Sequence, residues 1–166
     1  MAALDTIICL YRRRGLIVGT VNADGEFKPL QEEIPSVSFN LCANNEHVPE
    51  IERYIRTVKD RMRSGYNSLR FEWVPQMIVI WLAANSVFWL NAFPHPDGVS
   101  DSLLPRFLIT GQRLDYKKHV RLKFGAYVQT HEEHTNGMEV RMVGAICLGP
   151  TGNEQGSHYF MSLGTG

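Results

Sequence analysis

The sequence has little cysteine and no excess of either charge, and both scarcities exclude classes of protein. Its three cysteines, Cys9, Cys42 and Cys147, are widely separated and form no CxxC pair. They exclude a disulfide scaffold and are typical of buried free thiols in a reducing compartment. The 17 basic side chains equal the 17 acidic ones, which argues against a histone-like polyanion binder but leaves local basic stripes open. With 44% hydrophobic residues among 166, the composition is that of a folded globular chain.

One long stretch lacks charge altogether. Between Trp73 and Pro96 there is no Asp, Glu, Lys or Arg, and the length would suffice to cross a membrane. Polar residues interrupt the stretch and prolines bracket a shorter segment: Gln76, Asn85, Asn91, Pro75 and Pro94. We therefore expect a helix over residues 76–91 that is buried on most sides, and no membrane span. The N-terminal basic residues follow the apolar run, so no secretory signal is expected.

The first 42 residues alternate helix and strand signals. Gly15 directly follows a run that ends in three arginines, which is typical of a helix C-terminus. Short runs rich in β-branched residues, bounded by turn residues, predict buried strands. The expected order is helix Leu4–Arg14, strand Leu16–Val21, polar turn Ala23–Phe27, weak helical turn Lys28–Glu33 and strand Ser36–Cys42.

The next helix has the clearest signature in the chain. Its apolar residues recur at spacings of three and four: Val48, Ile51, Ile55, Val58 and Met62. Pro49 suits the first turn, and Asn44 or Asn45 is placed to cap the helix. A second face carries Glu52, Arg56, Lys59 and Arg63, at spacings of four, three and four. Taken alone, this face is a solvated surface with slight stabilisation from the Glu52–Arg56 pair.

The sequence pattern changes after residue 94. Residues 95–119 show no sustained hydrophobic periodicity, and this absence indicates a linker. Three short alternating runs then predict a small antiparallel β module: Val120–Thr130, Arg141–Leu148 and His158–Leu163. The predicted division is therefore 1–94, 95–119 and 120–166.

Two carboxylates occupy positions that can share a divalent cation. Asp24 lies in the polar turn at the carboxyl end of the first predicted strand, and Glu52 lies on the helix after the second. Mg²⁺ and Mn²⁺ prefer oxygen ligands, and phosphoryl transfer by two metals uses carboxylates to hold the ions. By itself, however, an Asp in a turn is usually an Asx-turn former.

The residues around these acids resemble the integrases of Copia-like retrotransposons, which insert element DNA into a chromosome. Val21–Phe27 (VNADGEF) is similar to the family's strand that ends in an aspartate. Val48–Thr57 (VPEIERYIRT) is similar to its helix with the last catalytic acid. Further similar segments follow in the family's order: Trp89–Phe93, Ser102–Arg106, Phe124–Val128, Gly144–Gly149 and Tyr159–Leu163.

This resemblance implies an α/β fold: a truncated RNase H-like core (strand-helix-strand-helix-helix) followed by a small SH3-like β-barrel. It implies that Asp24 and Glu52 are the second and third members of a catalytic acidic triad that binds Mg²⁺ or Mn²⁺. The family's first catalytic aspartate lies on an earlier strand, upstream of every residue here. We therefore expect the isolated chain to bind metal weakly if at all and to be inactive or very weak.

The resemblance makes DNA the expected partner. Arg56, Lys59 and Arg63, with Lys117 and Lys118 near the β module, would contact DNA phosphates, although a solvated surface remains the alternative for both sets. Because a truncated core would leave a sheet edge open, we also expect marginal stability or association with a second copy, unless the remainder of an integrase polyprotein covers the edge.

The sequence thus favours an integrase fragment involved in DNA integration. The alternative is a non-catalytic nucleic-acid- or protein-binding module derived from such an enzyme. No membrane partner is expected, and the expected location is intracellular, cytoplasmic and nuclear if the chain is functional.

Overall fold

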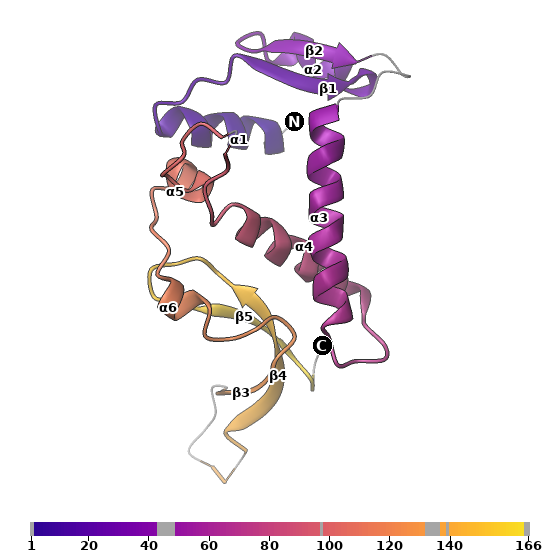
Figure 1. The fold of residues 1–166 in the computed structure, drawn as a ribbon, viewed down its shortest axis with the longest axis vertical. Coiled ribbons are helices and arrows are strands. Elements are labelled where there is room, and N and C mark those ends of the chain that lie inside the picture. The colour runs from indigo at the N-terminus through magenta and orange to yellow at the C-terminus, as the bar shows by residue number, and fades with distance from the viewer. Residues whose placement is uncertain (1, 43–48, 97, 132–136, 139, 165–166) are drawn as a thin grey trace. The chain divides into compact units, whose positions relative to one another are not determined.

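A computed structural model of the chain describes residues 2–42, 49–96, 98–131, 137–138 and 140–164. These residues form a mixed α/β structure of helices and two small sheets (Figure 1). The chain divides into two compact units, unit 1 with Met1–Thr57 and Leu108–Gly111, and unit 2 with Val58–Phe107 and Gln112–Gly166. The division expected at residues 94/95 and 119/120 stays a prediction.

Unit 1 contains a parallel strand pair with short helices. Its elements are α1 (Ala2–Arg13), β1 (Thr20–Asp24), the 3₁₀ turn η1 (Gly25–Phe27), α2 (Lys28–Glu33) and β2 (Ser38–Cys42). Strands β1 and β2 are in register with Thr20 opposite Ser38 and Asp24 opposite Cys42. Gly15 follows α1 at φ +74°, a conformation that glycine adopts without strain, so the predicted end of this helix is confirmed.

The first strand begins later than the sequence predicts. Leu16–Gly19 is not strand, and Ile17 is 93% exposed, so the expected buried strand was wrong over these residues. The cause lies in the partner strand. Pro35 and Ser36 form a turn, and pairing starts only where the Ser38 amide donates to the Gly19 carbonyl at 3.0 Å. Residues before Gly19 therefore have no strand beside them.

The core of unit 1 lies between α1 and one face of the strand pair. Ile8, Ile34 and Val37 are buried there, and partly buried side chains from α1, from the segment before β1 and from both strands pack around them: Leu4, Val18, Val21 and Phe39. Cys9 follows Ile8 on the helix and is exposed, while Cys42 is half-buried. The expectation of three buried thiols was therefore wrong for Cys9, because successive helical residues differ in direction by about 100°.

Helix α3 (Pro49–Asn67) begins in unit 1 and continues into unit 2. It confirms the predicted amphipathic helix, although the proposed caps Asn44 and Asn45 lie outside the described residues. The remaining elements are α4 (Gln76–Leu90), α5 (Pro105–Thr110), α6 (Tyr116–His119), β3 (Tyr127–His131), β4 (Met142–Pro150) and β5 (His158–Ser162). The segment expected as a linker therefore holds two short helices.

Helix α4 occupies the uncharged stretch and is at least partly buried on most sides, as expected. Ile78, Leu82 and Ser86, four residues apart, are buried, and most of the remaining residues are half-buried. The exposed residues, such as Met77 and Ile80 at 53% and 57%, lie on one face, and the sheet of unit 2 covers the face that carries Ile78. Among the described helices, none combines the length and apolar character needed to cross a membrane.

The predicted antiparallel β module is present in unit 2. Its strand order is β3-β4-β5, with Tyr127 opposite Ile146 and Cys147 opposite Phe160. The register shifts between Cys147 and Gly149, which places one extra residue in β4.

The core of unit 2 joins α4 to the central strand of this sheet. Ile78 packs with Ile146 and Leu148, and the rings of Trp81 and Tyr159 lie 4.7 Å apart. Burying such an aliphatic side chain contributes about 1.5–3 kcal/mol. The α4–β4 contact therefore holds α4 against the sheet.

Candidate nucleic-acid interface

Asp24 is the last residue of β1, so the strand runs three residues beyond its predicted end at Val21 and includes the start of the predicted turn. Its carboxylate Oδ1 accepts a hydrogen bond of 2.7 Å from the Gly25 amide and so caps η1. The side chain is exposed. One carboxylate oxygen is thus engaged in a local turn, which is the common role of Asp at such a position.

Glu52 lies near the start of α3 and is also exposed. It belongs to the same unit as Asp24, at the beginning of the helix that follows β2. Two carboxylates supply the oxygen donors that Mg²⁺ and Mn²⁺ prefer. In the part of the chain that the structure describes, no group of three or more His, Cys, Asp or Glu side chains gathers around a common point. The proposed metal pair therefore stays a prediction.

The three predicted cations of α3 lie exposed on one helix face. Arg56, Lys59 and Arg63 follow at spacings of three and four residues along this 19-residue helix. Arg63 donates to the Asp60 carboxylate at 2.7 Å, but both side chains are well exposed, so this pair contributes little to stability. The face therefore presents a row of three cations, with Glu52 at its start and Asp60 beside Arg63.

Two of these cations also line a groove between α3 and α4. Lys59 and Arg63 form its charged side, and Tyr66, Asn67 and Val79 complete much of the wall around a volume of about 250 Å³. All of these residues belong to unit 2. The structure thus brings Lys59 and Arg63 together, whereas Arg56 lies one turn earlier on the helix.

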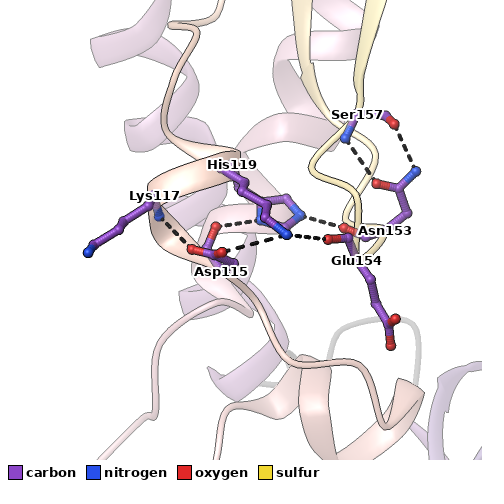
Figure 2. A network of polar contacts seen from close by, with 7 residues as sticks. Asp115, Lys117, His119, Asn153, Glu154 and Ser157 are labelled. Atoms are coloured by element: carbon purple, nitrogen blue, oxygen red, sulfur yellow. Dashed lines mark hydrogen bonds and ion pairs between the residues drawn. The ribbon is translucent and has the colours of Figure 1, made fainter.

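The second predicted cluster lies on α6 and is divided in its roles (Figure 2). Lys117 is exposed, and its backbone amide donates to the Asp115 carboxylate at 3.0 Å. Lys118 is half-buried: its Nζ donates to the Glu154 carbonyl at 3.2 Å and lies 3.8 Å from the Asp115 carboxylate. Lys118 therefore holds α6 to the β4–β5 connection, while Lys117 has its ammonium in solvent.

His119 is an organising residue that the sequence argument missed. Its ring is fully buried, with Nδ1 2.7 Å from the Asp115 carbonyl and Nε2 2.9 Å from the Asn153 carbonyl (Figure 2). A neutral imidazole can donate to one of these oxygens, and only the doubly protonated ring donates to both. The partner Asn153 lies 34 residues away. The sequence around His119 therefore contains no pattern from which this contact could be predicted.

Two side chains near the core have shifted pKa values for physical reasons. Burial lowers the pKa of Arg106, partly opposed by its interaction with Tyr159, and its guanidinium lies 5.0 Å from the centre of the Phe88 ring. Arg106 Nη2 also donates to the Gly152 carbonyl at 3.0 Å. Burial raises the pKa of the Cys147 thiol. Arg106 thus links Phe88 of α4 to the connection that follows β4.

Comparison with known proteins identifies no relative. No family model, no curated protein and no solved structure matches the chain. The integrase resemblance therefore rests on the sequence motifs, and the functional argument rests on the positions of the side chains.

Proposed function

We propose that the chain is a DNA-binding module of integrase type, which contacts the phosphate backbone through the cationic face of α3. The observation that carries this proposal is the exposed row of Arg56, Lys59 and Arg63 on one continuous helix. Seven residues of helix span about 10 Å. Successive phosphates rise about 3.4 Å each along one strand of duplex DNA, so this length covers three intervals, or about four phosphates, which is enough for one contact from each of the three cations.

The integrase origin is the finer part of the proposal. It is supported by the order of elements in roughly the first half of the chain, where strand β1, helix α2, strand β2 and two longer helices follow each other. It is also supported by the parallel pairing of β1 and β2 and by the antiparallel strands after them. On this proposal the former part is RNase H-like, the latter is SH3-like, and Asp24 and Glu52 are the remaining acids of a metal site.

The proposal is tested by titrating fluorescently labelled duplex DNA with the full chain over a salt series. Three phosphate contacts predict a log–log slope of affinity against salt of about −3 and a dissociation constant of about 10⁻⁴–10⁻⁶ M at physiological salt. Replacing Arg56, Lys59 and Arg63 with Gln should bring the slope close to zero, about one unit for each cation. Replacing Asp60 with Asn should strengthen binding, because Arg63 then loses its competing carboxylate.

The matched control is Arg12→Gln/Arg13→Gln, which removes exposed cations from α1 and should leave most of the slope intact. An unchanged slope in the α3 variant, or an equal loss in the α1 control, would contradict the proposal. The same titration in Mg²⁺ and in chelator separates backbone binding from a metal site. Strand transfer that needs Mg²⁺ and is lost in Glu52→Gln would overturn the expected inactivity of the isolated chain.

A further inference from the structure

A second cavity in unit 2 lies on the opposite side of α3 from the Lys59 groove. It is enclosed by the second half of α3, by α4 and by residues 120–124, and its volume is about 380 Å³. That volume would hold about a dozen water molecules at about 30 Å³ each, which is more than a bare inorganic anion fills. It falls in the range of about 300–1,000 Å³ that is typical of pockets for small organic ligands.

Two cations lie at this cavity without a compensating acid. Arg61 of α3 and Lys123 both line it and are exposed, and its lining contains no Asp or Glu. Within the described residues, neither side chain makes an ion pair or hydrogen bond. The one acid in this half of α3, Asp60, is paired with Arg63. The electrostatic potential in the cavity is therefore positive and favours the binding of an anion.

A neutral donor lies beside the cations. Asn85 of α4 lines the cavity and is half-buried, and its amide has no hydrogen-bond partner among the residues described. Gly149 makes room for it: a Cβ at that glycine would lie 2.6 Å from Asn85 Oδ1, and the glycine has φ +109°. The Asn85 amide can therefore donate to a polar group that binds in the cavity.

The rest of the wall is apolar and partly aromatic. Trp89 and Phe124 line the cavity, and both are half-buried. Aromatic side chains bind flat rings by stacking or edge contacts, with about 1–3 kcal/mol per nucleobase in known nucleic-acid complexes. The cavity thus combines two cations and an amide with an aromatic wall.

We propose that this cavity binds a nucleoside monophosphate unit, with the phosphate between Arg61 and Lys123 and the base against Trp89 and Phe124. This site does not use Arg56, Lys59 or Arg63 and stands apart from the proposed duplex binding. The unit has two sources that share this chemistry: a free nucleotide and the phosphorylated end of a single strand.

The test measures binding of adenosine 5′-monophosphate by the full chain, with amide chemical-shift mapping to locate it. Adenosine without phosphate, and inorganic phosphate alone, should each bind at least about tenfold more weakly. The variant Arg61→Gln/Lys123→Gln should lose at least about tenfold in affinity for the nucleotide. Arg70→Gln/Arg141→Gln removes the same charge from exposed positions outside this cavity and should change nothing.

Shifts confined to residues 61–68, 82–90 and 120–124 would support the site. Equal binding of adenosine and its phosphate, or full affinity in the Arg61/Lys123 variant, would overturn it. A short single strand with a 5′-phosphate, compared with the same strand ending in a hydroxyl, separates the two sources. Tighter binding of the phosphorylated strand than of the free nucleotide assigns the site to strand ends, and the reverse assigns it to free nucleotides. The salt dependence of duplex DNA binding by the Arg61/Lys123 variant then measures the contribution of Arg56, Lys59 and Arg63 separately.

Discussion

At the scale of single residues, burial decides how the three cysteines behave. Cys147 is fully buried on β4, and burial raises the pKa of its thiol because the thiolate is disfavoured away from water. Cys9 is exposed on α1. The two thiols therefore differ in environment although the sequence offers no sign of that difference.

We predict that a thiol-alkylating reagent modifies Cys9 promptly and Cys147 at least about tenfold more slowly in the native protein. Denaturant should abolish this difference.

The raised pKa of the Cys147 thiol also means that the unfolded chain loses the Cys147 proton at lower pH than the folded chain. Folding stability should therefore fall as pH rises through the ordinary pKa of a thiol. Cys147→Ala should lose this part of the alkaline decline, and an unchanged decline would contradict the assignment.

At the scale of elements, α6 is too short to be stable by itself and depends on its side-chain contacts. Its four residues are held by the buried ring of His119 against the Asp115 and Asn153 carbonyls. The Asn153 side chain in turn pairs with Ser157, donating from Nδ2 and accepting from the Ser157 amide. The helix and the β4–β5 connection therefore stabilise each other.

We predict that His119→Ala lowers the free energy of unfolding by about 2–4 kcal/mol, because it removes the hydrogen bonding of the ring to the Asp115 and Asn153 carbonyls and opens a buried space. Urea denaturation measures the loss, and amide exchange at residues 151–157 should accelerate. Lys117→Ala, an exposed change on the same short helix, should stay within about 0.5 kcal/mol of the parent. Equal effects of both substitutions would show that the ring does not hold the connection.

Elements with strong local signals were predictable, and those set by distant partners were not. The turn at Lys28–Glu33 and the amphipathic helix α3 appear where the spacing of residues places them. The start of β1 depends on the turn at Pro35 in the other strand, and His119 depends on a carbonyl 34 residues away. For the candidate site, periodicity placed Arg56, Lys59 and Arg63 on one face. It gave no sign of the cavity at Arg61 and Lys123, which forms only when α3, α4 and residues 120–124 pack.

At the scale of the whole molecule, the two units differ in how much they bury. Unit 1 has a small cluster around Ile8 and a two-stranded sheet, which is marginal by itself. Unit 2 has a three-stranded sheet whose central strand is buried over six consecutive residues, from Ala145 to Pro150. Within the described strands, β1 and β2 each pair on one side and leave the other edge open. Association with a second copy through these edges stays a prediction.

We predict that hydrogen exchange, followed by mass spectrometry, is slowest in β4 and on the buried side of α4. Amides of β1 and β2 should exchange faster, because fewer buried contacts must break to expose them. We therefore expect the sheet of β1 and β2 to open before the sheet of β3, β4 and β5. Slowest exchange at Thr20–Asp24 would contradict this assignment of stability.

The central position of β4 has a consequence for biosynthesis. Strand β3 leaves the ribosome before β4, but β5 follows it and can pair only when His158–Ser162 has emerged. Until then the uncharged run Val143–Leu148 keeps one edge open, and short apolar runs of this kind are prone to intermolecular strand pairing. A nascent or truncated chain that stops before His158 would therefore tend to aggregate through β4, and slower translation at this point would prolong the exposure.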